Sequence, residues 1–225
     1  MKRQLLHTPE GVRDIYNDEC EKKMLLQDQL YHILRLHGYH PIQTPTFEFF
    51  DIFGREIGTT PSKDLYKFFD REGNTLVLRP DITPSIARCA AKYFGEEELP
   101  IRLCYMGNTF INNSSYQGRL KECTQLGAEL LGDPSVDADA EMISMVISCL
   151  KAAGLKEFQL SIGHADFFRG LMEAAGLLEV ALRRIFATSF ISTINVLCPL
   201  ARSSDAPTRV KMRSTIPIFA DAAGT

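Results

Sequence analysis

The chain has 225 residues, of which 45% are hydrophobic and 24% are charged, and its formal net charge at pH 7 is −3. This length and composition suffice to bury one hydrophobic core. The slight excess of acid excludes a broad basic surface of the kind that attracts nucleic acid, which argues against a tRNA-gripping role. The six cysteines form no CxxC pair, and no uncharged run approaches the length of a membrane span. We therefore expect a cytoplasmic protein with no metal, no cofactor, no disulfide framework and no membrane contact.

The first predicted element is an amphipathic helix over residues 19–36, where apolar side chains recur at helical spacing and Gly38 supplies a stop signal. Pro41 and Pro45 exclude a helix from the next segment and favour an extended edge strand. Because such an edge often meets a partner, we expect dimerisation through the region from Tyr39 to Glu48.

Two short strands are predicted over residues 65–69 and 75–78, joined by a turn that contains Gly73. Thr83 is placed to cap the following helix and Pro84 suits its first turn. This helix is expected to end by Gly95, and its core face is expected to carry three residues, Ile86, Ala90 and Tyr93.

A longer antiparallel pair is predicted over residues 101–110 and 119–131, because both stretches are apolar and a polar loop separates them. A helix over 137–153, a strand over 157–162 and a short helix over 166–175 follow. From about Ala187 onward no period or cap signal frames an element. The acidic run Glu96-Glu97-Glu98 is interpreted as a solvated loop.

Four strings of sequence carry a resemblance to a known family. They are Gly11-Val-Arg-Asp, Gly38-Tyr-His-Pro-Ile-Gln-Thr-Pro-Thr-Phe-Glu, Arg79-Pro-Asp-Ile-Thr-Pro-Ser-Ile-Ala-Arg, and Gly118-Arg-Leu-Lys-Glu-Cys-Thr-Gln-Leu-Gly-Ala-Glu-Leu-Leu-Gly. In this order and spacing they resemble the class II histidyl-tRNA synthetase family. The resemblance implies an α+β fold, a mostly antiparallel sheet flanked by helices. It assigns residues 1–186 to an incomplete synthetase-like domain that lacks the third signature motif, and it leaves 187–225 as a poorly specified tail.

Two departures separate the chain from an active synthetase of that family. The family string Arg-Pro-Glu-Gly-Thr is replaced by Arg79-Pro80-Asp81-Ile82-Thr83, and the family string Phe-Arg-x-Glu is replaced by Phe110-Ile111-Asn112-Asn113. In the family the lost arginine holds the α-phosphate and the amino-acid carboxylate, a role that an isoleucine cannot perform. Loss of one such donor costs about 10²–10³ in rate. The chain is thus similar to the branch that forms the regulatory subunit of ATP phosphoribosyltransferase.

The remaining polar residues of the resemblance suggest a histidine site. Gln125, Gly127 and Glu129 are two apart, so in a strand they share one face, with room at Gly127 for a pocket floor. The resemblance implies that Gln125 and Glu129 contact the amino group of histidine and that Thr83 and Asp81 face the same ligand. The alternative is that Thr83 is only a helix cap and Asp81 only a turn residue.

The anion side of the site is left open by the sequence. Arg119 and Lys121 lie near the missing arginine as imperfect substitutes and are candidate anion-binding residues. The alternative is that the loop over residues 112–117 shifts the alignment and an arginine arrives from elsewhere.

The resemblance also implies partners. They are a short-form ATP phosphoribosyltransferase catalytic subunit that performs the chemistry, a second copy of the chain, and histidine as an effector. The rival interpretations are an active histidine–tRNA ligase and an inert truncated paralogue.

Overall fold

The structure is a computed structural model, and it describes residues 6–54, 60–113, 120–162, 165–176, 192–197 and 211–214. Its helices and strands follow one another as α1 (Asn17–Leu36), β1 (His40–Pro41), β2 (Phe47–Phe49), α2 (Asp51–Gly54), a 3-10 turn (Ser62–Asp64), β3 (Lys67–Phe69), β4 (Thr75–Leu78), α3 (Thr83–Tyr93), β5 (Ile101–Phe110), β6 (Glu122–Leu131), α4 (Val136–Ala152), β7 (Gln159–Ile162), α5 (Ala165–Ala174), β8 (Ser192–Leu197) and β9 (Lys211–Ser214). The predicted elements from residue 19 to residue 175 all exist, with boundaries shifted by a few residues.

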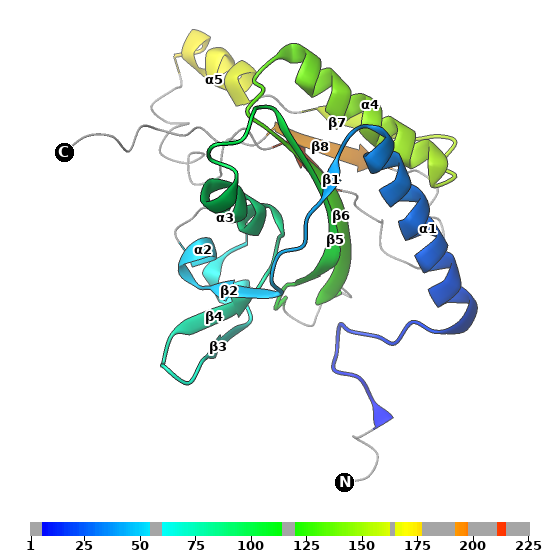
Figure 1. The fold of residues 1–225 in the computed structure, drawn as a ribbon, viewed down its shortest axis with the longest axis vertical. Coiled ribbons are helices and arrows are strands. Elements are labelled where there is room, and N and C mark those ends of the chain that lie inside the picture. Colours follow the sequence, from blue (N-terminus) through cyan, green and yellow to red (C-terminus); the bar gives the residue numbers. More distant parts are fainter. Residues whose placement is uncertain are drawn as a thin grey trace, which may run out of the picture.

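The central sheet has the order β1-β5-β6, with β1 parallel to β5 and β5 antiparallel to β6. The long hairpin runs in register from Ile101 opposite Leu131 to Phe110 opposite Glu122. Figure 1 shows α1 and α4 on one side of this hairpin and α3, α2 and a smaller sheet on the other. The expected α+β fold with a mostly antiparallel sheet flanked by helices is confirmed.

Alternation along β5 and β6 divides the buried residues between the two faces of the sheet. One cluster joins the sheet to α1 and α4 and consists of Leu34, Tyr39, Cys104, Ala128, Leu130, Ala138, Met142, Met145, Val146, Cys149 and Leu150. The other joins the sheet to α3 and consists of Ile82, Ile86, Ala90, Leu103, Tyr105 and Leu131. The prediction for Tyr93 is wrong, because this last residue of α3 is 64% exposed.

The smaller sheet has the order β2-β4-β3 and is antiparallel throughout. The predicted hairpin β3–β4 is confirmed, and its turn places Gly73 at a φ of 84°, in the region that favours glycine. Phe47 and Phe49 on β2 are 51% and 57% exposed, and the ring of Phe47 meets that of Phe68 edge to face at 5.7 Å. This sheet therefore presents an aromatic surface.

The region from Tyr39 to Glu48 is only partly available to a partner. Tyr39 is 2% exposed and its hydroxyl donates to Met142 Sδ at 2.9 Å, while Glu48 is 8% exposed and bonded to Arg88 at 2.7 Å. Both ends of the proposed dimer segment are thus buried and bonded within their own chain. Phe47 is the large apolar side chain of this segment that lies at the surface.

The last described segments differ from the sequence-based expectation. Residues 192–197 and 211–214 form β8 and β9, which extend β7 into an antiparallel sheet of order β7-β8-β9. The rest of the stretch after residue 187 lies outside the described residues, so the division at residue 186 stays a prediction. No described helix is long and apolar enough to cross a membrane.

Candidate functional site

The predicted site residues lie on the face of the β5–β6 hairpin that looks toward α3. Cross-strand pairing sets Leu103 opposite Glu129 and Tyr105 opposite Gly127. Leu103 and Tyr105 belong to the cluster packed on α3, so Glu129 and Gly127 share that side of the sheet. The turn before α3 and its first residue bring Asp81 and Thr83 over the same strands, where they contact Gln125 and Glu129.

Glu129 is a buried acid, with 1% of its surface exposed. Its Oε1 accepts a hydrogen bond from the Thr83 hydroxyl at 2.7 Å and a longer one from the Tyr105 hydroxyl at 3.5 Å. A carboxylate withdrawn from water is costly unless donors surround it, and hydroxyl donors to an ionised acceptor make strong hydrogen bonds. Thr83 and Glu129 are thus joined directly, and their ligand roles stay predictions.

Gln125 connects Asp81 with Glu129 through the hydroxyl of Tyr105. Its Nε2 donates to Asp81 Oδ1 at 3.2 Å and to the Tyr105 hydroxyl at 3.1 Å. Asp81 Oδ1 also accepts the backbone N–H of Thr83 at 3.3 Å. All four predicted histidine-site residues therefore belong to one hydrogen-bonded chain, which passes through a tyrosine that the sequence did not single out.

The interpretation of Thr83 as a helix cap is wrong. The N-cap of α3 is Ile82, which makes no side-chain cap hydrogen bond, and Thr83 is already the first helical residue. Its hydroxyl is turned to Glu129, 46 residues away in sequence, where it supplies a buried acid with a donor. Asp81 does hold the turn, through the Thr83 N–H, and in addition accepts from Gln125.

The space beside Gly127 is occupied, contrary to the expectation of an open pocket floor. A Cβ built on Gly127 would lie 2.4 Å from the Tyr105 hydroxyl oxygen and 2.5 Å from its Cζ. The glycine is needed because the Tyr105 ring lies across it. Room between the two polar groups of β6 is therefore filled by the protein itself.

Arg79 is a second residue that sequence reasoning missed, although it begins one of the family-like strings. Its guanidinium is buried, and it donates to the carbonyl oxygens of Asn108 at 2.8 Å and Thr44 at 2.9 Å. Burial lowers the pKa of Arg79, and the charge of Glu48 acts in the opposite sense. This cation ties the segment before β2 to β5, and its terminal nitrogen lies over Gly107.

The anion side of the site is less complete. Ile111 follows β5 directly and its N–H donates to the carbonyl oxygen of Lys121 at 2.9 Å, so the two residues meet at the end of the hairpin. The stem of Lys121 lies against the α-carbon of Gly11. Arg119 lies outside the described residues. Anion binding by Arg119 and Lys121 stays a prediction.

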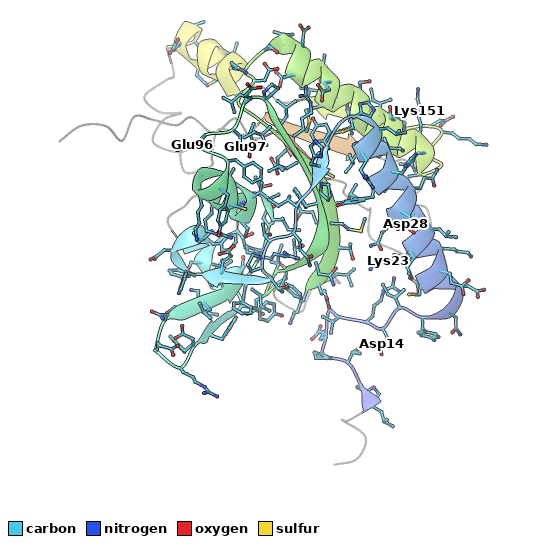
Figure 2. The ribbon with its side chains drawn as sticks, in the orientation of Figure 1. Asp14, Lys23, Asp28, Glu96, Glu97 and Lys151 are labelled. Atoms are coloured by element: carbon cyan, nitrogen blue, oxygen red, sulfur yellow. The ribbon has the colours of Figure 1, made fainter. Side chains whose placement is uncertain are left out.

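Other candidate sites are limited. Among the residues that the structure describes, no group of three or more His, Cys, Asp or Glu side chains is placed to hold a metal ion. A hollow of about 520 Å³ at the start of α1 shares no residue with the site above and is lined by Arg13, Asp14, Tyr16, Asn17, Asp18 and Glu19. Figure 2 labels Asp14 there, and it labels Glu96 and Glu97 in the loop after α3, whose exposed side chains confirm the solvated-loop interpretation.

Comparison with known proteins gives consistent matches. A family model described as histidyl-tRNA synthetase matches residues 11–213. An ATP phosphoribosyltransferase regulatory subunit from Ruminiclostridium cellulolyticum is 48% identical over 176 residues, which are 78% of this chain and 42% of that protein. The chain spans about two fifths of the length of the curated relatives that it matches.

Solved structures agree on the fold. A crystal structure of an ATP phosphoribosyltransferase regulatory subunit/histidyl-tRNA synthetase from Bacillus halodurans is 38% identical with a TM-score of 0.72, over 80% of this chain and 46% of that one. An apo histidyl-tRNA synthetase from S. aureus is 28% identical with a TM-score of 0.62, over 80% of this chain and 44% of that one.

Proposed function

The chain belongs to the histidyl-tRNA synthetase family, and from that premise we propose that it is a non-catalytic regulatory subunit of ATP phosphoribosyltransferase, which serves histidine biosynthesis. The observation that carries the proposal is the isoleucine at position 111, at the end of the β5–β6 hairpin. A class II ligase requires a cation there to stabilise charge on phosphate. Two relatives at 45–48% identity, both named ATP phosphoribosyltransferase regulatory subunit, support the same choice.

The retained half of the site supports histidine as the effector. Asp81 and Glu129 supply two carboxylates, and Gln125 adds an amide between them. Histidine offers an ammonium group and an imidazole, both of which pair well with carboxylate acceptors. A site that keeps these acceptors without the phosphate-side arginine binds the amino acid and does not activate it.

The partner in this proposal is the short catalytic subunit, which performs the transferase chemistry in the cytoplasm while this chain supplies an activating surface. Feedback then requires that histidine favour the less active arrangement of the complex. The chain itself is proposed to dimerise through the region from Tyr39 to Glu48, with contact centred on the exposed Phe47 because Tyr39 and Glu48 are buried. tRNA has no role in this proposal.

The decisive experiment mixes the purified chain with the short catalytic subunit and measures two quantities. Phosphoribosyltransferase turnover should rise on mixing, and calorimetry should detect L-histidine binding to the chain. Turnover that is unchanged, together with no histidine binding, would favour the inert-paralogue interpretation.

An active histidine–tRNA ligase is the second candidate, favoured by the fold shared with the S. aureus synthetase. It predicts histidine-dependent exchange of pyrophosphate into ATP by the chain alone. We expect no exchange above background, because Ile111 cannot hold the α-phosphate. Robust exchange would reverse the proposal.

A further inference from the structure

We infer that Tyr105 is the positioning residue of this site: its ring fixes how much space a ligand has, and its hydroxyl orients Gln125 beside Glu129. The inference deepens the proposed histidine-sensing role and rests on it. Tyr105 is on β5, whereas the residues of the family-like strings that line the site come from β6 and the start of α3.

The ring is held in one place by its surroundings. Tyr105 is 4% exposed and lies in the apolar cluster between β5 and α3. It lies across the strand pair onto Gly127, its register partner, so closely that any side chain at Gly127 would overlap the phenol. Because buried aromatic rings tolerate little displacement, the space above Gly127 is closed to a ligand.

The hydroxyl has one proton, and its neighbours decide where that proton points. Gln125 Nε2 can only donate, so the Tyr105 oxygen accepts at 3.1 Å. The phenol proton is then directed to Glu129 Oε1 at 3.5 Å, next to the hydroxyl of Thr83. The Gln125 amide nitrogen, which donates to both Asp81 and Tyr105, is thereby held in one orientation.

A ligand that fits these constraints is small and carries its own donors. An ammonium or a protonated ring nitrogen can reach the acids at Asp81 and Glu129, while a bulky substituent would require the space that Tyr105 fills. The tyrosine therefore sets both the size and the donor character of the ligand, without supplying charge.

The test is calorimetric titration of the full 225-residue chain with L-histidine, in the parent and in Tyr105→Phe. Removing the hydroxyl while keeping the ring should weaken binding about tenfold, as expected for one hydrogen bond. The matched control is Tyr39→Phe, which removes an equally buried hydroxyl from the other side of the sheet, where it donates to Met142. This control should change histidine affinity by less than about twofold, while unfolding midpoints report any structural loss in each variant.

A double-mutant cycle separates positioning from general damage. Gly127→Ala forces the ring aside, so it should weaken histidine binding by a similar factor, and the double variant with Tyr105→Phe should lose little more than either single variant. Parental affinity in Tyr105→Phe, or equal loss in Tyr105→Phe and Tyr39→Phe, would overturn the inference while leaving histidine sensing intact. No histidine binding by the parent chain would overturn both.

Discussion

The two faces of the β5–β6 hairpin are built from the same strands, yet one is wholly apolar where it is buried and the other combines an apolar cluster with buried polar side chains. Toward α1 and α4 the strands present Cys104, Ala128 and Leu130, which pack with methionines and valine of α4. Toward α3 the neighbouring residues are Gly127, which the Tyr105 ring lies across, and Glu129, which accepts hydrogen bonds from the hydroxyls of Thr83 and Tyr105. Ala128 and Glu129 are adjacent in sequence and both are buried, at 2% and 1% exposure.

The difference teaches that burial alone does not identify a stabilising residue. Apolar side chains toward α4 gain free energy by leaving water. A carboxyl group toward α3 loses hydration on burial, and hydrogen-bond donors such as the Thr83 hydroxyl offset that loss. Both faces pack the sheet onto helices, and the α3 face in addition buries the polar residues of the candidate site. Each of the following experiments separates these two roles.

The largest effect is expected on the apolar face. Met145→Ala in α4 removes a side chain with no exposed surface and should lower the free energy of unfolding by about 2–5 kcal/mol, because the cavity cannot fully collapse. Urea denaturation followed by circular dichroism measures the change. The matched control is Met24→Ala in α1. The Met24 side chain is 58% exposed, so this variant should have nearly the parental stability. Equal losses of unfolding free energy in the two variants would show that Met145 contributes no more to stability than the exposed Met24.

The polar face should show the reverse pattern. Glu129→Gln removes the charge but keeps an oxygen acceptor for Thr83, so histidine affinity should fall by about 10- to 100-fold, as for other lost charged hydrogen bonds. Stability should change by less than about 1 kcal/mol, because the amide has nearly the same shape. Calorimetry and urea denaturation on the same sample measure both quantities. Unchanged histidine affinity would place the effector elsewhere.

Alkaline pH should lower the stability of the apolar face because the buried thiol of Cys149 resists ionisation. Burial raises the pKa of Cys149 from 9.0 to about 11, so the unfolded chain releases this proton first as the pH rises. Stability should therefore fall between about pH 9 and pH 11, by on the order of 2 kcal/mol for this residue. Comparing urea midpoints across this range in the parent and in Cys149→Ala tests it. If stability falls as steeply with pH in Cys149→Ala as in the parent, the fall is not caused by Cys149.

The smallest expected effect is at the rim of the apolar face, where Arg102 binds Glu141 of α4 at 2.8 Å. The Arg102 guanidinium holds the pKa of the Glu141 carboxyl below its ordinary value of 4.5, so the stabilisation is present above that pH and is lost as the pH falls through the lowered value. Glu141→Gln should cost about 0.5–1 kcal/mol at pH 7 and nothing at strongly acid pH. Glu19→Gln, which breaks the more exposed pair with Arg13, is the control and should leave the unfolding midpoint unchanged.

Local sequence patterns predicted the order of elements well, because helical and strand periods are local properties. The pairing of β5 with β6 and the helix α4 were predicted because strand and helix periods can be read from a few neighbouring residues. The grouping of Gln125 with Glu129 on one face was predicted for the same reason. Their ligand roles stay predictions.

What the sequence could not reveal depends on contacts between distant segments. Threonine is a common helix-capping residue, so the sequence predicted a cap at Thr83. Only the fold brings its hydroxyl to Glu129. The Tyr105 ring fills the space at Gly127 from the neighbouring strand, and Arg79 reaches carbonyl groups 29 and 35 residues away. A glycine between two polar residues signals a close approach, but the identity of the approaching group is a tertiary fact.

The contact between Tyr105 and Gly127 also bears on how these two positions can change during evolution. A methyl group at 127 would overlap the phenol at 105, so each position limits the other. Descendants of this gene should therefore vary at the two positions together, with a smaller residue at 105 preceding any side chain at 127. A substitution at one of the two positions therefore changes what the other can accept.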